Sequence, residues 1–274
     1  SSALPQYLID QLKARHIGKI DDDGFYMFQF PGTHHLMRPV VRFEAGFPVE
    51  LDSPSNDLYY TEVGGKGLVI FIGDEPQLNV EQYIDAILEA AAQLKVSRIV
   101  GFGGVYAEVP YDKERTVSSA YSRRELRPVL EKLAVNFSDY RGGAAIGSVL
   151  CYRASQRKQD YASFYAFVPN YDLSDFSDLE NTIRSENDFM SWLNVMRRVN
   201  HFLEIEIDLS DLEARTAELI SVIDKKVDEL DLETPSAGLR SYFTQLATAF
   251  DEEVFNPLDD VWEDELRRLL DDDE

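Results

Sequence analysis

The spacing of apolar residues in the first part of the chain predicts one helix followed by extended segments. From Leu4 to Lys13 the apolar positions recur every three to four residues, which places them on one helical face. After a turn at Asp21–Gly24, the stretches 25–30 and 38–43 have the β-branched and aromatic content of strands. The N-terminal part is therefore predicted to contain an amphipathic helix and two strands.

The next segments predict a hairpin and then a strand–helix–strand unit. Residues 57–63 are expected to pair with the run 68–73 through the glycine-rich turn between them, and that run is apolar at every position, as in a strand covered on both faces. A helix over 80–94 follows, with Asn79 as its predicted N-cap, and then a short buried strand over 98–103. Strands joined in this way are typical of a parallel sheet with right-handed crossovers.

The remaining segments of the core alternate in the same manner. Strands are predicted over 116–121 and 161–168, and helices over 123–133 and from the glycines at 142–143 to about residue 154. The predicted fold class is α/β, a three-layer α/β/α sandwich with a mostly parallel central sheet.

Beyond residue 169 the pattern becomes helical. Amphipathic helices are predicted over 188–202, 209–230, 239–250 and 258–270. Pro235 is expected to end the second of them. We therefore divide the chain into an α/β domain over 1–207 and a helical C-terminal extension over 208–274, which packs on the core or on a neighbouring subunit.

The placement of charge excludes some classes of partner. The net charge is −23, and the residues from 204 to the end carry 23 acidic and 6 basic side chains, whereas the first 203 residues carry 27 and 21. An acidic extension argues against binding nucleic acid or an anionic membrane. The extension is either a solubilising helical surface or a docking face for a basic partner.

Composition also limits the compartment and the chemistry. No stretch approaches the ~18 uncharged apolar residues of a membrane span, and the first ten residues lack the features of a signal peptide. The single cysteine, Cys151, fits a reducing cytoplasm. The histidines show no metal-ligand spacing, so neither a metal nor a cofactor is expected.

Two places in the pattern are candidates for ligand binding. Asp74 and Glu75 follow a predicted strand, where open α/β sheets bind ligands, and they either hold a ligand or simply stabilise the turn. Arg141, Gly142 and Gly143 open a predicted helix, whose free N–H groups can hold a carboxylate or phosphate. The two glycines can equally serve close packing of helix and strand, because the segment lacks a P-loop or dinucleotide pattern.

Several short segments, each weak alone, form an ordered set between residues 4 and 210. They are Asp23-Gly24-Phe25-Tyr26, Arg38-Pro39-Val40, Gly73-Asp74-Glu75-Pro76, Val109–Arg115, Tyr140–Gly147 and Val168-Pro169-Asn170-Tyr171. In that order they resemble Asp-x-Phe-x-Asp, Arg-Pro-x-Val, Gly-x-Glu-Pro, Val-Pro-His-x-Arg-Pro, Tyr-x-Gly-Pro-x-Gly-Ile-x-Gly and Val-Pro-His-Tyr. These are elements of the PAC2 family, the proteasome-assembly-chaperone-like α/β proteins, which the chain resembles over most of its length.

The chain departs from the family in two ways. Tyr111 and Asn170 stand where the family has histidines, so histidine chemistry is not carried over. Relatives also begin with a strand and a Gly-Trp-x-Asp-Ala-Gly turn, so we expect the natural chain to begin upstream of Ser1.

The resemblance and the strand-end pattern together give eight candidate ligand-binding residues and no catalytic ones. They are Asp74, Glu75, Arg115, Arg141, Gly142, Gly143, Asn170 and Tyr171.

The resemblance implies a non-enzymatic, chaperone-like interaction protein. It implies a homo-oligomer, such as a trimeric ring, with a protein client such as a proteasome subunit. The alternative is an enzyme, because the family fold resembles that of phosphorylases and hydrolases. Such an enzyme would bind an anion at Arg141–Gly143 and a polar or nucleoside substrate near Asp74, Glu75 and Asn170. Fold alone does not decide between the two.

Overall fold

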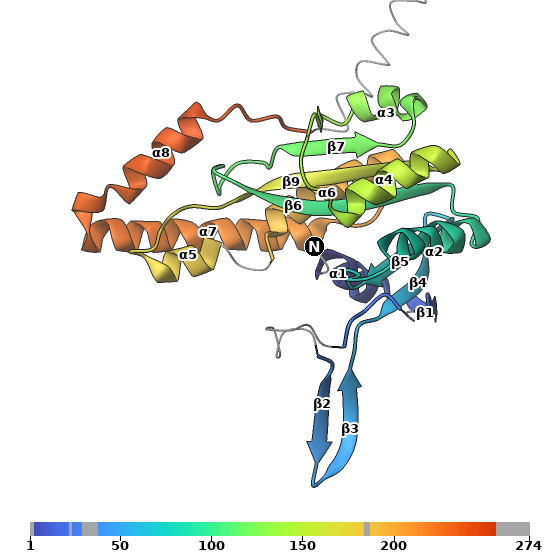
Figure 1. Ribbon diagram of the computed structural model, residues 1–274. Coiled ribbons are helices and arrows are strands. Elements are labelled where there is room, and N and C mark those ends of the chain that lie inside the picture. Colours follow the sequence, from blue (N-terminus) through green and yellow to red (C-terminus); the bar gives the residue numbers. More distant parts are fainter. Residues whose placement is uncertain (1–2, 22–23, 29–37, 184–186, 256–274) are drawn as a thin grey trace, which may run out of the picture. The chain divides into compact units, whose positions relative to one another are not determined.

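The computed structural model describes residues 3–21, 24–28, 38–183 and 187–255 (Figure 1). The predicted helix over 258–270 lies outside these residues. The chain divides into two compact units. Unit 1 consists of Ser1–Ser97 and Gly143–Arg157, and unit 2 consists of Arg98–Gly142 and Lys158–Glu274.

Unit 1 contains an antiparallel sheet, sheet A, with a helix packed on it. The strand order is β1 (Arg15–Lys19), β4 (Asn56–Val63) and β5 (Lys66–Gly73). Helix α1 (Ala3–Leu12) packs against β5 and buries Leu4, Leu8 and Ile9, as its periodicity predicts. The hairpin of β4 and β5 is confirmed, and its turn uses Gly64 and Gly65, which both have positive φ.

Two helices of unit 1 are joined by ion pairs. They are α2 (Val80–Gln93) and α4 (Ile146–Arg157). Both carboxylate oxygens of Asp85 lie 2.7 Å from Nη2 of Arg153, and Oδ1 lies 2.9 Å from Arg157. These arginines hold the pKa of Asp85 below its usual value, chiefly through the Arg153 hydrogen bond. Asn79 precedes α2 as predicted, but its side-chain amide donates to the Gly24 carbonyl at 2.9 Å instead of capping the helix.

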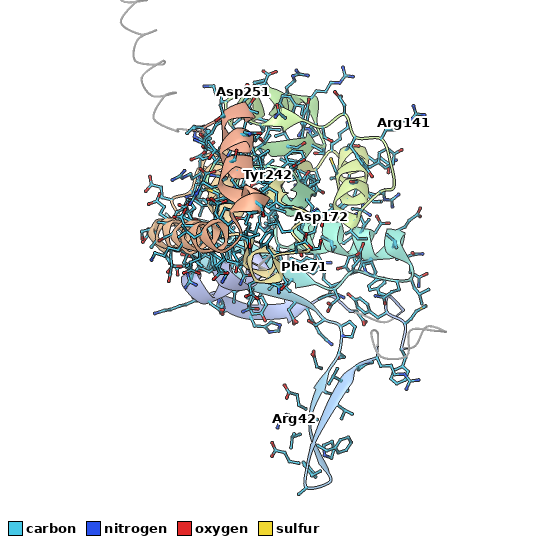
Figure 2. All side chains as sticks on the ribbon, turned by 90° about the vertical axis from the view of Figure 1, so that its left-hand side faces the viewer. Arg42, Phe71, Arg141, Asp172, Tyr242 and Asp251 are labelled. Atoms are coloured by element: carbon cyan, nitrogen blue, oxygen red, sulfur yellow. The ribbon has the colours of Figure 1, made fainter. Side chains whose placement is uncertain are left out.

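A second hairpin of unit 1 consists of β2 (Val40–Glu44) and β3 (Phe47–Asp52), and every residue of both strands is exposed. It projects from the rest of the unit in Figure 1, and Figure 2 shows side chains, Arg42 among them, along both of its sides. The prediction of an extended segment over 38–43 is confirmed from residue 40 onward. The prediction of a strand over 25–30 is wrong for residues 25–28, which form turns and bends.

Unit 2 is built on a four-stranded sheet, sheet C. Its order is β6 (Arg98–Ala107), β9 (Asp160–Pro169), β7 (Val117–Tyr121) and β8 (Asn136–Phe137). The pairs β6–β9 and β7–β8 are parallel, and β7–β9 is antiparallel. The predicted fold class, α/β with a mostly parallel central sheet and a helical C-terminal part, is confirmed. The parallel partner of β6 is β9, whereas the sequence pattern favoured β5, which pairs with β4 in sheet A.

Unit 2 also contains helices, of which α6 packs on sheet C. A short 3-10 turn leads into α3 (Arg127–Glu131). The others are α5 (Ser177–Ile183), α6 (Phe189–Leu203), α7 (Ser210–Glu233) and α8 (Leu239–Ala249). Helix α6 packs on β6 and β9, and α7 packs on α5, α6 and α8 (Figure 1). Among the described residues, no helix combines the length and the apolar character that crossing a membrane requires.

The C-terminal helices of unit 2 share a hydrophobic core with its central loops. Tyr111 and Tyr171 from the loops pack in one cluster with Ile223 and Val227 of α7 and Phe243 of α8. Phe243 makes edge-to-face contacts with both tyrosines, with ring centroids 5.1 Å apart in each case. Of the two packings expected for the helical extension, on the core or on a neighbouring subunit, the structure shows α7 and α8 packed on the core.

Candidate functional site

The carboxylate of Asp74 stabilises the turn after β5. Its Oδ2 accepts the backbone N–H of Ser55 at 3.0 Å, and the Asp74 carbonyl accepts the hydroxyls of Tyr26 and Tyr83, each at 3.0 Å. The neighbouring Glu75 is exposed, and its carbonyl accepts the side-chain amide of Gln77 at 2.8 Å. These contacts show that Asp74 stabilises the turn, and ligand binding by Asp74 and Glu75 stays a prediction.

Close packing surrounds this turn. A Cβ on Gly73 would lie 2.5 Å from the Phe71 ring, 2.6 Å from the Tyr83 hydroxyl and 2.7 Å from the side-chain oxygen of Asn56. Only glycine fits here without a shift of its neighbours. Burial raises the pKa of Tyr83, so its hydroxyl stays protonated and donates.

Arg115 is buried in the loop that follows β6, and the partners of its guanidinium among the described residues all belong to unit 2. Nη1 bonds the carbonyls of Pro110 and Lys113, both at 2.7 Å, and Nη2 bonds that of Tyr111 at 3.1 Å. Nε lies 3.0 Å from Oδ2 of Asp188, and Nη2 lies 3.4 Å from Oδ1. An arginine has five N–H donors, and these five contacts occupy them. Arg115 therefore fixes the loop, and no donor is left for a ligand.

The carboxyl ends of β6 and β9 continue side by side into this loop. The N–H of Asn170 donates to the Ala107 carbonyl at 2.9 Å, and the Tyr171 hydroxyl donates to the Val109 carbonyl. The Tyr171 side chain is buried, and burial raises its pKa. The structure thus brings Arg115, Asn170 and Tyr171 together at one end of sheet C.

The other candidate residues are divided between the two units. Asp74, Glu75 and Gly143 belong to unit 1, whereas Arg141 and Gly142 belong to unit 2. Arg141 is exposed, and its side chain is labelled in Figure 2. Anion binding at this segment stays a prediction, as does the wider ligand layout that would join these residues.

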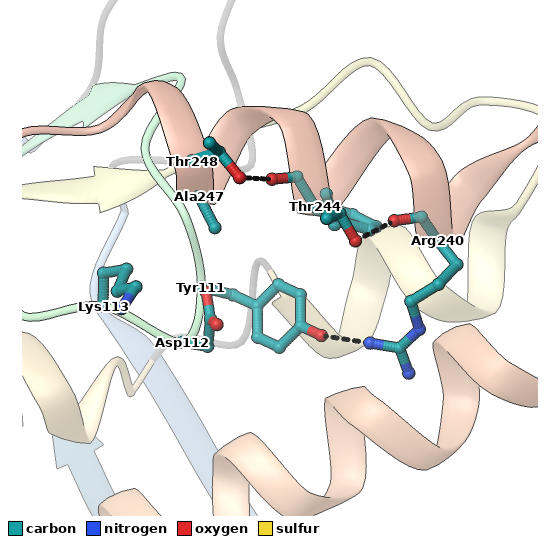
Figure 3. Close-up of a pocket in the computed structure, with 8 residues that line it drawn as sticks. Tyr111, Asp112, Lys113, Arg240, Thr244, Ala247 and Thr248 are labelled. Atoms are coloured by element: carbon teal, nitrogen blue, oxygen red, sulfur yellow. Dashed lines mark hydrogen bonds between the residues drawn. The ribbon is translucent and has the colours of Figure 1, made fainter.

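Unit 2 also holds a pocket of about 340 Å³ between the loop after β6 and α8 (Figure 3). Tyr111, Lys113, Arg240, Thr244 and Thr248 contribute to its lining. The pocket was not predicted, because its two walls are separated by more than a hundred residues. Tyr111 alone was singled out from the sequence, as the residue at a family histidine position.

The charges of this pocket are neutralised by acidic neighbours. Nη1 of Arg240 lies 3.2 Å from Asp224, and Nε lies 3.0 Å from Asp228, whose hydrogen bond is the main cause of the raised pKa of Arg240. The Tyr111 hydroxyl donates to Asp224 at 2.6 Å, and burial together with this bond raises the pKa of Tyr111.

The second cation of the pocket is also paired. Nζ of Lys113 lies 3.1 Å from the carboxylate of Glu252, which also accepts the backbone N–H of Glu114 at 2.8 Å. An anionic ligand would have to displace one of these ion pairs. At this pocket the loop after β6 is thus hydrogen-bonded and ion-paired to the C-terminal part of the chain. Because carboxylates already pair with its cations, the pocket does not favour binding of a small anion.

Comparisons with known proteins agree with the fold described above. The sequence model of the PAC2 family matches residues 1–227. A proteasome-assembly chaperone homologue from Mycobacterium tuberculosis is similar, with a TM-score of 0.67 and 23% identity over 81% of this chain and 87% of its own. A PAC2 family protein from Streptomyces avermitilis gives a TM-score of 0.68 and 22% identity over 85% and 91%.

A more distant similarity is to an archaeal proteasome activator from Pyrococcus furiosus. The TM-score is 0.54, with 19% identity over 82% of this chain and 86% of the other. A comparison with curated protein sequences finds no match. The structural likenesses concern the fold, and the family match covers more than half of the sequence. The chain belongs to the PAC2 family.

Proposed function

We propose that the protein is a non-enzymatic interaction protein of the chaperone type, which associates with itself and binds a protein client. The observation that carries the proposal is the match of the PAC2 family over residues 1–227. Relatives of the same fold bear the names proteasome-assembly chaperone homologue and proteasome activator, so the client class we propose is a proteasome subunit. The self-association is a small homo-oligomer, such as a trimeric ring, in the cytoplasm.

The polar contacts of unit 2 support an interaction role. All five N–H groups of Arg115 bond described residues of the protein, and Lys113 and Arg240 of the pocket are each paired with a carboxylate. Polar groups that are hydrogen-bonded within the protein hold the loop in one conformation. A surface that is already ordered loses little conformational entropy when a partner binds. No contact among the described residues favours the enzyme alternative, which stays a prediction.

The self-association is tested by the molar mass of the purified protein in solution. Light scattering coupled to gel filtration should give a multiple of the single-chain mass of 31.3 kDa at micromolar concentration. A mass of one chain over the whole concentration range contradicts the self-association.

Client binding is tested separately with purified proteasome α-subunits. The protein should co-migrate with unassembled α-subunits in gel filtration and not with assembled proteasome particles, whose assembly surfaces are covered. An unrelated protein of similar negative charge controls for electrostatic adhesion to basic surfaces. Absence of co-migration with either form, at low and at physiological salt, contradicts the client class.

A further inference from the structure

The threonines of α8 offer only acceptors to the pocket shown in Figure 3. Thr244 donates its hydroxyl to the Arg240 carbonyl, and Thr248 donates its hydroxyl to the Thr244 carbonyl, each at 2.7 Å. A threonine hydroxyl has one donor and two acceptor lone pairs. Because each donor is used within the helix, the lone pairs of both oxygens are what the threonines present to a ligand.

Asp112 contributes a third acceptor group to the same pocket. Figure 3 shows it on the loop after β6, across the pocket from the two threonines. Its side chain is exposed, and in the part of the chain that the structure describes its carboxylate has no hydrogen-bond or ion-pair partner. An ionised carboxylate accepts hydrogen bonds and donates none.

The guanidinium at the edge of this pocket has no donor left for a ligand. All five N–H groups of Arg240 are occupied. Two of them bond Asp228, two bond Asp224, and the fifth bonds the Tyr111 hydroxyl. The groups that remain for a ligand are therefore mainly acceptors, and acceptors select a ligand that carries donors.

The charge around the pocket favours a cationic donor. Lys113 is paired with Glu252 at 3.1 Å, so its charge is neutralised, whereas the carboxylate of Asp112 is not. Residues 210–255, which include α8, carry 11 acidic and four basic side chains. A region of this charge attracts a basic partner and raises its rate of association.

The size of the pocket fits one side chain. Its volume of about 340 Å³ lies at the lower end of the range for ligand pockets. An ammonium group has three donors and no acceptor, which matches the three acceptor groups of the lining. Phe243 and Ala247 supply an apolar part of the lining, against which the methylene stem of a lysine can lie.

We propose that this pocket receives the side chain of a lysine on a protein partner. The proposal rests on the client binding proposed above, and it assigns the place and the chemistry of one contact. The ammonium group donates to Asp112, Thr244 and Thr248, and the ion pairs of Lys113 and Arg240 stay intact.

The first test follows a lysine probe, Nα-acetyl-lysine amide, on the full chain by NMR. The methyl signals of Thr244, Ala247 and Thr248 report binding in the pocket. Asp112→Asn should raise the dissociation constant about tenfold, through the loss of one charge-assisted hydrogen bond. Asp139→Asn removes the same charge at an exposed position outside the lining and should change it by less than about twofold.

A second variant separates the hydrogen bonds from the net charge. Thr244→Val with Thr248→Val keeps the charge and the side-chain shape, and it should also raise the dissociation constant about tenfold, read at the Ala247 methyl group. The matched control is Thr182→Val, because Thr182 donates to the carbonyl four residues earlier on α5 in the same way. The Nε-acetylated form of the probe carries no charge and should not bind.

The outcomes that overturn the proposal can be told apart from failure of the proposed function. Absence of shifts at the pocket methyl groups in the wild type, or equal binding of the Nε-acetylated probe, overturns the proposal. Wild-type binding of proteasome α-subunits by the Asp112→Asn variant also overturns it. If the wild type binds no α-subunit, the client class fails. In that case a probe that binds with the expected dependence on Asp112 supports the lysine site, and a probe that does not bind overturns it.

Discussion

Replacing Arg115 by methionine removes the charged group that holds the loop after β6, while keeping a side chain of similar length. The Arg115 side chain is 2% exposed and that of Asp188 is 12% exposed, so the variant leaves a carboxylate in a poorly hydrated place. The carbonyls of the loop lose their donors at the same time. Removing one partner of a buried ion pair costs about 3–5 kcal/mol.

We expect a loss of about 3 kcal/mol in the free energy of unfolding at neutral pH, the lower end of that range. The reason for the lower value is that Asp188 keeps one favourable contact, the backbone N–H of Ser191 at 3.2 Å. Urea unfolding followed by circular dichroism and tryptophan fluorescence measures the change, because Trp192 lies on the helix that Asp188 caps.

Two further variants test the reasoning itself. Arg127→Met removes an exposed pair with Glu131 and should change the stability too little to measure. Arg115→Met combined with Asp188→Asn should be more stable than Arg115→Met alone, because no unpaired charge remains and asparagine still accepts the cap hydrogen bond. A loss below about 1 kcal/mol in Arg115→Met, or no recovery in the double variant, would refute the reasoning.

Three more expectations concern packing and electrostatics. Gly73→Ala should lower the free energy of unfolding by about 1–3 kcal/mol because its Cβ overlaps three side chains, whereas Gly143→Ala, with open space at its Cβ, should have little effect in the same urea assay. Asp85→Asn should destabilise the protein at neutral pH. Because the pKa of Asp85 in the folded state is depressed, the difference in free energy of unfolding between wild type and variant should be fully present above about pH 4. It should disappear as the pH falls through the lower, folded-state pKa. A difference that does not depend on pH would contradict the ion-pair account. Phe243→Ala should lower the free energy of unfolding by about 3–5 kcal/mol, measured by heat or urea, because it leaves a cavity in the core. Leu232→Ala, at a position that is 82% exposed, should not change it. Equal effects of the two variants would rule out a core role for α8.

Most helices and strands could be predicted because their periodicity is local. The alternation and the Gly64-Gly65 turn give the β4–β5 hairpin, and the apolar spacing gives α1, α2, α6 and α7. The strand prediction at 25–30 failed over 25–28 because Phe25 packs edge-to-face on Tyr83 of α2, with centroids 5.3 Å apart, and its carbonyl bonds the N–H groups of Gln77 and Leu78. Aromatic residues that anchor a turn resemble those of a strand.

Long-range partners were harder to predict. Helix α5 is seven residues long and buries only Leu179 and Ile183, which is too little periodicity to detect. The partners of Arg115 on α6 and at its cap lie more than seventy residues further along the chain, so the sequence indicates the arginine but not its role. The pocket was missed for the same reason, because α8 supplies one wall and the loop after β6 supplies the other.

The discontinuity of unit 1 has a consequence for how the protein is synthesised. Its second stretch, Gly143–Arg157, contains α4, whose arginines hold Asp85, and it leaves the ribosome only after β6, β7 and β8 of unit 2. A nascent chain that stops before residue 143 therefore exposes the face of α2 that α4 covers. An expressed fragment that ends near residue 97 would therefore lack α4, the helix that completes unit 1.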